Sequence, residues 1–194
     1  MPRRRLRSQG EVVARCLALQ AAVRDALARV ETGEEDPDAV DAVWQAEALG
    51  TLLWALQLVE LPPYDQHFDP ADVTDTPLDG AELRDAEELR LECESARLWH
   101  WRARTRELQA RDDVELPDRF GSFDALIAAT AMRGFEDGVL PAPTRGDFAA
   151  FGRVYRQLSP EQYAEVRSIA VERHHALNWL CGAGGGWDNV PLDT

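Results

Sequence analysis

Residues 44–56 read WQAEALGTLLWAL, and a helix made from this stretch carries apolar side chains on two faces. One face holds four leucines, Leu49, Leu52, Leu53 and Leu56. The opposite face holds Val40, Trp54 and Leu58. A helix with two apolar faces is covered on both sides, so we predict that it is the central helix of the fold. Gly50 lies between the faces, where the missing side chain allows a neighbouring helix to approach closely.

Proline, glycine and capping residues set the expected limits of the helices. The central helix is expected to begin near Asp36 or Asp38 and to end at about Glu60, before Pro62 and Pro63. Further helices are expected over residues 8–33, about 80–111, 122–137 and 159–182, with capping boxes at the start of the first and the last. A short helical stretch is expected after Asp147.

The remaining segments are expected to be irregular. Residues 61–79 contain four prolines and form a long loop, for which Tyr64 and Phe68 are the expected anchors. Residues 182–194 form an irregular tail. Because the sequence shows neither alternating apolar runs nor a repeat of fixed period, a sheet and a solenoid are both unsupported. The sequence therefore predicts an all-α fold, an irregular bundle of about five helices.

The length and charge of the chain argue against several classes of protein. A chain of 194 residues can form one domain, residues 1–194, without help from metals or disulfides. Its formal net charge of -14 repels phosphate backbones, so nucleic acid is not an expected partner. The exception is a basic tail over residues 1–7, whose arginines are expected to be solvated and flexible. The absence of a long apolar run predicts a cytoplasmic protein without a membrane partner.

The cysteines are expected to be reduced. Cys16, Cys93 and Cys181 are odd in number and far apart, and each lies among apolar residues in a helix-like pattern. We therefore expect free, buried thiols in a reducing compartment.

Several stretches together resemble one known family. They are WQAEALGTLLWAL at residues 44–56, LWHWRART at residues 98–105 and ERHHALNWL at residues 172–180. The closing WDNVPLDT at residues 187–194 is similar as well, so the resemblance covers nearly the whole chain. On these motifs the chain resembles a widespread, largely bacterial domain-of-unknown-function family (family 4272). The resemblance implies no known activity, substrate or catalytic residue.

Arg173 is the most informative charged residue of the last expected helix. It falls within an apolar stripe formed by Val166, Ile169, Ala176, Leu177 and Leu180. Because a buried guanidinium must be paired, we predict a structural ion pair with a carboxylate. Glu47 on the central helix is the first choice, and Asp188 and Asp193 of the tail are the alternatives.

A competing hypothesis makes Arg173 an anion clamp in a ligand pocket. A forked guanidinium binds carboxylates and phosphates, and Arg102 is also expected to face inward. The pocket for a small anionic molecule would be lined by Glu47, Trp99, Arg102, Arg173, His175 and Asn178. In the structural alternative, the tryptophans belong to the core and the histidines have bonded partners at helix interfaces.

Metal and cofactor sites are not expected. Glu172 and His175 have the Glu-x-x-His spacing of metal-binding bundles, but the sequence has no second copy. The glycine-rich residues 182–186 follow an expected helix rather than a strand, unlike a phosphate-binding loop. The sequence also has no recognisable nucleophile pattern or paired-cysteine motif. We therefore expect no metal and no cofactor, and we assign no catalytic residue.

Two functions remain after the sequence analysis. An acidic helical domain without a recognisable catalytic pattern is best explained as a non-catalytic binding or protein-interaction module. The alternative is a small-molecule enzyme or ligand-binding domain with Glu47, Arg102, Arg173 and His175 around one pocket. A deep polar pocket that contacts all four would favour the alternative, whereas a flat exposed apolar patch would favour the interaction module.

Overall fold

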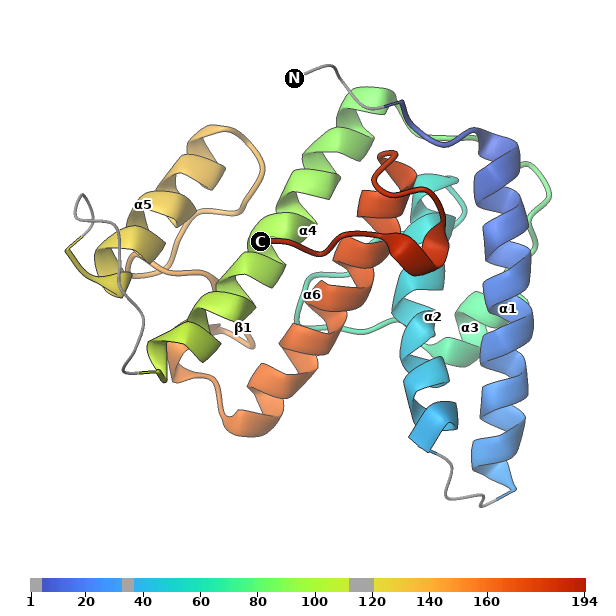
Figure 1. Ribbon diagram of the computed structural model, residues 1–194, viewed down its shortest axis with the longest axis horizontal. Coiled ribbons are helices and arrows are strands. Elements are labelled where there is room, and N and C mark those ends of the chain that lie inside the picture. Colours follow the sequence, from blue (N-terminus) through green and yellow to red (C-terminus); the bar gives the residue numbers. More distant parts are fainter. Residues whose placement is uncertain (1–4, 33–36, 112–120) are drawn as a thin grey trace.

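The computed structural model describes the backbone of residues 5–32, 37–111 and 121–194, and the side chains of these residues except 37–41. Within these ranges the fold is an all-α bundle of six α-helices with one two-stranded sheet (Figure 1). Helix α2 (Pro37–Ala55) lies between α1 (Gln9–Glu31) and α6 (Pro160–Leu180), and α6 lies between α2 and α4 (Ala86–Gln109). Helix α5 (Phe123–Glu136) packs on the outer side of α4, and the short α3 (Pro70–Asp75) packs against α1 and α2. None of these helices is long and apolar enough to cross a membrane.

The prediction of a central helix is confirmed, and its second predicted face is described at Trp54, because the Val40 side chain lies outside the described residues and Leu58 lies beyond the helix. The leucines of one face of α2 are fully buried, and Trp54 on the other face is also buried. The helix ends at Ala55 rather than at about Glu60. The chain leaves the helical path at Gln57, which has a φ of 60°, and the Leu58 amide then donates back to the Leu53 carbonyl at 3.0 Å. Of the two expected starts, Asp36 lies outside the described residues.

Gly50 allows a close approach, but of a loop rather than of a helix. A Cβ added at Gly50 would collide with the ring of Phe68, which lies directly on the α2 backbone. Tyr64 and Phe68 are buried, as expected of the anchors of this loop. The sequence analysis missed α3 inside the loop, where the Asp69 side chain accepts a hydrogen bond from the Ala71 amide and so caps the helix.

Capping interactions set the other helix limits. The two predicted capping boxes are present, Ser8 with Glu11 before α1 and Ser159 with Gln162 before α6. Ser122 caps α5, which ends at Glu136, close to the expected limit. Helix α4 begins at Ala86 rather than near residue 80, because the Asp85 side chain caps it by accepting a hydrogen bond from the Glu87 amide.

The segment after Asp147 begins with a small hairpin that the sequence did not predict, and a short helical stretch follows the hairpin. Strand β1 (Ala149–Ala150) pairs antiparallel with β2 (Arg153–Val154), and a 3-10 helix, η1 (Tyr155–Gln157), follows. The two turn residues, Phe151 and Gly152, have φ angles of 53° and 65°. Such turns favour Asn or Gly at both positions, so a phenylalanine at the first of them conceals the hairpin in the sequence.

The segment before α1 and the C-terminal tail both contact the C-terminal part of α6. The Arg7 amide donates to the Leu180 carbonyl at 2.9 Å, so the expectation of a flexible tail over residues 1–7 is wrong for Arg7. Residues 1–4 of that tail lie outside the described residues. The C-terminal tail contains a second 3-10 helix, η2 (Trp187–Asn189), and runs back across α6 (Figure 1).

The prediction of three free cysteines is wrong for two of them. Cys93 on α4 and Cys181, directly after α6, form a disulfide although 88 residues separate them. The packing of α4 on α6 brings them together, which a cysteine count and spacing do not reveal. Cys16 is free and fully buried, and this burial raises the pKa of its thiol to about 12. The disulfide therefore links α4 to the start of the C-terminal tail.

Candidate functional site

Arg173 and Glu47 form an ion pair between α6 and α2, in the middle of the bundle. The Arg173 Nε donates to the Glu47 Oε2 at 3.1 Å, and both side chains are buried. The structure thus contains the pairing that the sequence analysis ranked first. Asp188 lies in η2 and Asp193 in the exposed end of the tail, and neither accepts a hydrogen bond from Arg173.

The same pair also fastens the loop that follows α2. The Arg173 Nη1 donates to the Pro62 carbonyl at 2.6 Å, and its Nη2 donates to the Gln66 carbonyl at 2.8 Å. The Glu47 Oε1 accepts a hydrogen bond from the Phe68 amide at 2.6 Å. Burial raises the pKa of Glu47, and the charge of Arg173 opposes this rise. All three guanidinium nitrogens are thus bonded inside the protein, which weakens the anion-clamp hypothesis.

Arg102 forms a second buried ion pair, with Asp147. Its Nε and Nη2 donate to the two carboxylate oxygens at 2.7 and 3.0 Å, and both side chains are buried. Asp147 also accepts hydrogen bonds from the amides of Phe148 and Arg156, and so fixes the segment that leads into the hairpin. The sequence analysis expected Arg102 to face inward but missed Asp147, because an aspartate in a loop gives no signal of burial.

The other two polar candidates hold the C-terminal tail. His175 Nε2 donates to the Trp187 carbonyl at 3.0 Å, and Asn178 Nδ2 donates to the Pro191 carbonyl at 2.5 Å. Trp99 lies elsewhere, stacked on Tyr64 with ring centroids 4.8 Å apart. The structure therefore divides the six candidates among separate places, and they do not surround one pocket.

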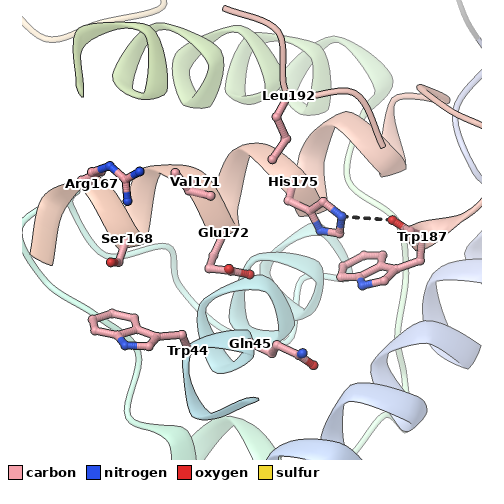
Figure 2. Close-up of a pocket in the computed structure, with 9 residues that line it drawn as sticks. All are labelled: Trp44, Gln45, Arg167, Ser168, Val171, Glu172, His175, Trp187 and Leu192. Carbon is pink, nitrogen blue, oxygen red and sulfur yellow. Dashed lines mark hydrogen bonds between the residues drawn. The ribbon is translucent and has the colours of Figure 1, made fainter. Parts of the chain in front are cut away.

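A groove between α2, α6 and the tail is the best candidate binding site, and we call it the α2–α6 groove. It has a volume of about 430 Å³ and is lined by Trp44, Gln45, Arg167, Ser168, Val171, Glu172, His175, Trp187 and Leu192. Figure 2 shows the α6 side chains along one wall and Trp44 and Gln45 of α2 along the other, with Trp187 at one end. Of the four residues in the one-pocket hypothesis, this groove contacts His175 and contains none of Glu47, Arg102 and Arg173.

The α2–α6 groove combines aromatic rings with polar groups of both signs. Burial lowers the pKa of His175, and its bond to the Trp187 carbonyl opposes this. Arg167 binds Glu107 at 2.7 Å but keeps about half of its side chain exposed. Ser168 is the groove's hydroxyl, and it lies apart from His175 in Figure 2. The groove thus offers surfaces for binding without a paired nucleophile and base.

A histidine pair lies outside the groove, between α4 and α6. The Nδ1 atoms of His100 and His174 are 2.9 Å apart, so one of them donates and the other accepts. Burial, followed by the charges of neighbouring His100, Arg97 and His175, lowers the pKa of His174 to about 4. In the described residues, no group of three or more histidine, cysteine or acidic side chains is arranged to hold a metal ion.

The sequence analysis found one wall of the groove in part and missed the other. It named His175 as a ligand candidate but did not select Trp44, Arg167 or Trp187. Trp44 is not one of the residues that define the two apolar faces of the central helix, and the polar residue Gln45 follows it. A tryptophan that neither face includes is the signal that could have identified it as a groove residue. No protein-family model, curated protein or solved structure matches this chain. The geometry of the site is therefore the basis for inferring a function.

Proposed function

We propose that the protein is a non-catalytic binding module that holds a segment of a partner protein in the α2–α6 groove. The observation that carries the proposal is the lining of this groove. The Trp44 and Trp187 indoles give it broad apolar surface, and polar side chains of α6 lie between them (Figure 2). Tryptophan and arginine are enriched at protein interfaces because they combine a large contact area with hydrogen bonding.

A small-molecule enzyme has less support from the same structure. The one-pocket hypothesis needs Arg102 and Arg173 to face a ligand, but each is buried against its own carboxylate. Removing either guanidinium from its partner would leave a buried charge uncompensated, at a cost of roughly 3–5 kcal/mol. A small anionic ligand at these arginines is therefore disfavoured.

Family membership and the cellular compartment are part of the proposal. We assign the chain to the domain-of-unknown-function family that it resembles, and this membership adds no activity. We also propose a cytoplasmic location, and the redox state of the Cys93–Cys181 disulfide in the isolated protein tests it. A disulfide that persists in the freshly isolated protein would instead favour an oxidising compartment.

Site-directed photo-cross-linking in cells tests the proposed function. A photoreactive residue replaces Ser168, which lines the groove, or Ala164, which is exposed on the same helix outside it. We expect Ser168 to give a discrete cross-linked partner and Ala164 to give none. Truncation of the groove wall by Trp44→Ala should remove this cross-link, whereas Trp101→Ala, on α4 and outside the groove, should retain it.

Two results would refute the proposed function. One is the same set of cross-linked products from Ser168 and Ala164, which would indicate random encounter. The other is an unchanged cross-link after Trp44→Ala in a protein whose circular dichroism matches that of the unsubstituted chain.

A further inference from the structure

A second cleft lies between the loop after α2, helix α4 and the segment before β1. It has a volume of about 490 Å³, and its lining shares no residue with the α2–α6 groove. Its walls are largely apolar, with the rings of Pro62, Pro63 and Pro141 beside Val139. Glu92 and Ser95 of α4 contribute polar groups to this lining. The cleft therefore combines an apolar surface with a carboxyl group, and its occupant is independent of the proposed partner segment.

Glu92 in this cleft is a carboxyl group that forms no ion pair with any residue in the described part of the chain. Its Oε1 accepts a hydrogen bond from the Tyr64 hydroxyl at 3.1 Å. Among the residues that the structure describes, no arginine or histidine forms an ion pair with it, although most arginines on α4 do have acidic partners. Burial raises the pKa of Glu92 to about 7, opposed by the Tyr64 bond and the charge of Arg173. A buried, ionised carboxylate is usually paired with a cation, and among the described residues Glu92 has no such ion-pair partner.

The charged groups around Glu92 favour a positively charged ligand. Asp65 is the other acidic residue in the lining, and it accepts a hydrogen bond from the Phe151 amide. The lining contains no arginine or histidine, and the segment before β1 contributes only Val139, Pro141 and Ala149. Arg173 from α6 lies beneath the ring of Tyr64, 4.9 Å from its centroid, and is already paired with Glu47. The formal net charge of -14 adds a long-range attraction for cations.

We propose that this cleft binds a small organic ammonium compound. Its cationic group pairs with the Glu92 carboxylate, and its alkyl part lies against the proline rings of the wall. Arg173 acts as a positioning residue in this site, because its bond to the Pro62 carbonyl holds the wall in place from below. The ligand supplies a counter-charge that no described residue places in an ion pair with Glu92.

The proposal has a defined pH dependence. A bound ammonium pairs with ionised Glu92 only, so its affinity follows the ionised fraction of this carboxyl group. With a pKa of about 7, that fraction and the affinity rise about ten-fold between pH 6 and pH 8. The ammonium group of an alkylamine keeps its proton over this range, because its pKa resembles that of lysine, about 10.4. A ligand that bound the protonated carboxylic acid would show the opposite trend.

Titration of the full chain with n-butylammonium and choline, followed by NMR, tests the proposal. We expect saturable shifts of the Ser95 and Val139 amides with both probes, and none with butyrate or n-butanol at the same concentrations. Glu92→Gln should weaken binding at pH 8 at least ten-fold and remove its pH dependence. The control Glu87→Gln, an exposed carboxyl group in the first turn of the same helix, should bind as the unsubstituted protein does.

A second variant keeps the test decisive if Glu92→Gln alters folding. Val139→Lys places a tethered ammonium inside the cleft and should abolish binding of both probes while the other amide signals stay in place. The proposal is overturned by the absence of saturable binding at millimolar probe, by equal binding of butyrate or n-butanol, or by affinity that falls as the pH rises. Photo-cross-linking from Ser168 is unaffected by any of these results, so the two sites succeed or fail separately.

Discussion

Arg102 and Arg173 are the largest of the fully buried side chains in the described part of the protein. Each bonds a carboxylate from a segment distant in the sequence, Asp147 and Glu47 respectively. Burying such charges is expensive, and a well-packed apolar pair would often be at least as stable. Arg173 also holds the loop after α2 in place, because it donates hydrogen bonds to the Pro62 and Gln66 carbonyls. We infer that both pairs serve to fix the loops that line the cleft containing Glu92.

The two partners of the Arg173–Glu47 pair should differ in how much their removal costs. Without Arg173, Glu47 can take up a proton, since burial already raises its pKa, and the carbonyls of Pro62 and Gln66 lie in residues with access to water. Without Glu47, the guanidinium keeps its charge in the core. We expect Glu47→Ala to cost roughly 3–5 kcal/mol, Arg173→Met to cost less, and the double variant to be non-additive by ~1 kcal/mol or more. Urea unfolding of the single and double variants measures this, and additive losses would contradict a coupled pair.

His174 should make the protein less stable in mild acid. Its pKa is lowered from 6.5 to about 4, mainly by burial, so between these values the unfolded chain binds a proton that the folded chain does not. Above pH 6.5 His174 is neutral in both states and does not affect the unfolding free energy. As the pH falls from 6.5 towards 4, the unfolding free energy decreases by roughly 3 kcal/mol. We expect His174→Gln to flatten the decline in unfolding free energy over this range. The control is His67→Gln, at an exposed histidine, and equal slopes for both variants would disprove the assignment to His174.

At the scale of elements, the sequence predicted helices well where capping groups and apolar periodicity agree. The capping boxes of α1 and α6 and the buried leucine face of α2 are of this kind. The misplaced limits depend on contacts distant in the sequence. The chain that leaves α2 is fixed by hydrogen bonds of the Arg84 and Glu82 amides to the Ala55 and Leu56 carbonyls. Helix periodicity carries no information about such contacts.

Gly50 should resist replacement although it lies within a helix. Alanine favours a helix over glycine by about 1 kcal/mol, but its Cβ at this position would enter the space of the Phe68 ring. We expect Gly50→Ala to destabilise the protein by roughly 1–3 kcal/mol, because the ring and its loop must shift. The matched control is Gly10→Ala in α1, where an added Cβ meets nothing within 4 Å and should be neutral or stabilising. Thermal unfolding of both variants decides this, and a stabilising Gly50→Ala would contradict the close approach.

At the scale of the whole molecule, the sequence revealed which residues are buried more readily than where a ligand would bind. Helical periodicity placed Arg173 in the core, and its first-choice partner Glu47 is where the structure has it. The α2–α6 groove arises from three segments, and Trp187 reaches it because the tail folds back onto α6. The Glu92 cleft likewise combines α4 with two loops. Such sites depend on the relative placement of segments, which local patterns do not encode.

The Cys93–Cys181 disulfide should stabilise the fold by linking α4 to the residue that follows α6. After oxidation in air, thiol titration of the unfolded protein should detect Cys16 alone, and the variant Cys16→Ser should give none. Reduction should lower the unfolding free energy by about 4 kcal/mol, because it releases a closed loop spanning 88 residues in the unfolded chain. Three thiols after the oxidation in air would contradict the disulfide.

Fluorine NMR of the protein labelled with 5-fluorotryptophan tests the central claim, binding in the α2–α6 groove, most directly. The chain has six tryptophans, of which Trp44 and Trp187 line the groove and Trp99 lines the Glu92 cleft. Single Trp→Phe variants assign the signals, and the labelled protein is titrated with the partner captured by cross-linking or with the protein fraction of the source cells. We predict that the largest shifts occur at Trp44 and Trp187, while Trp99 stays unchanged. Shifts confined to Trp99, or equal shifts at all six positions, would contradict the account.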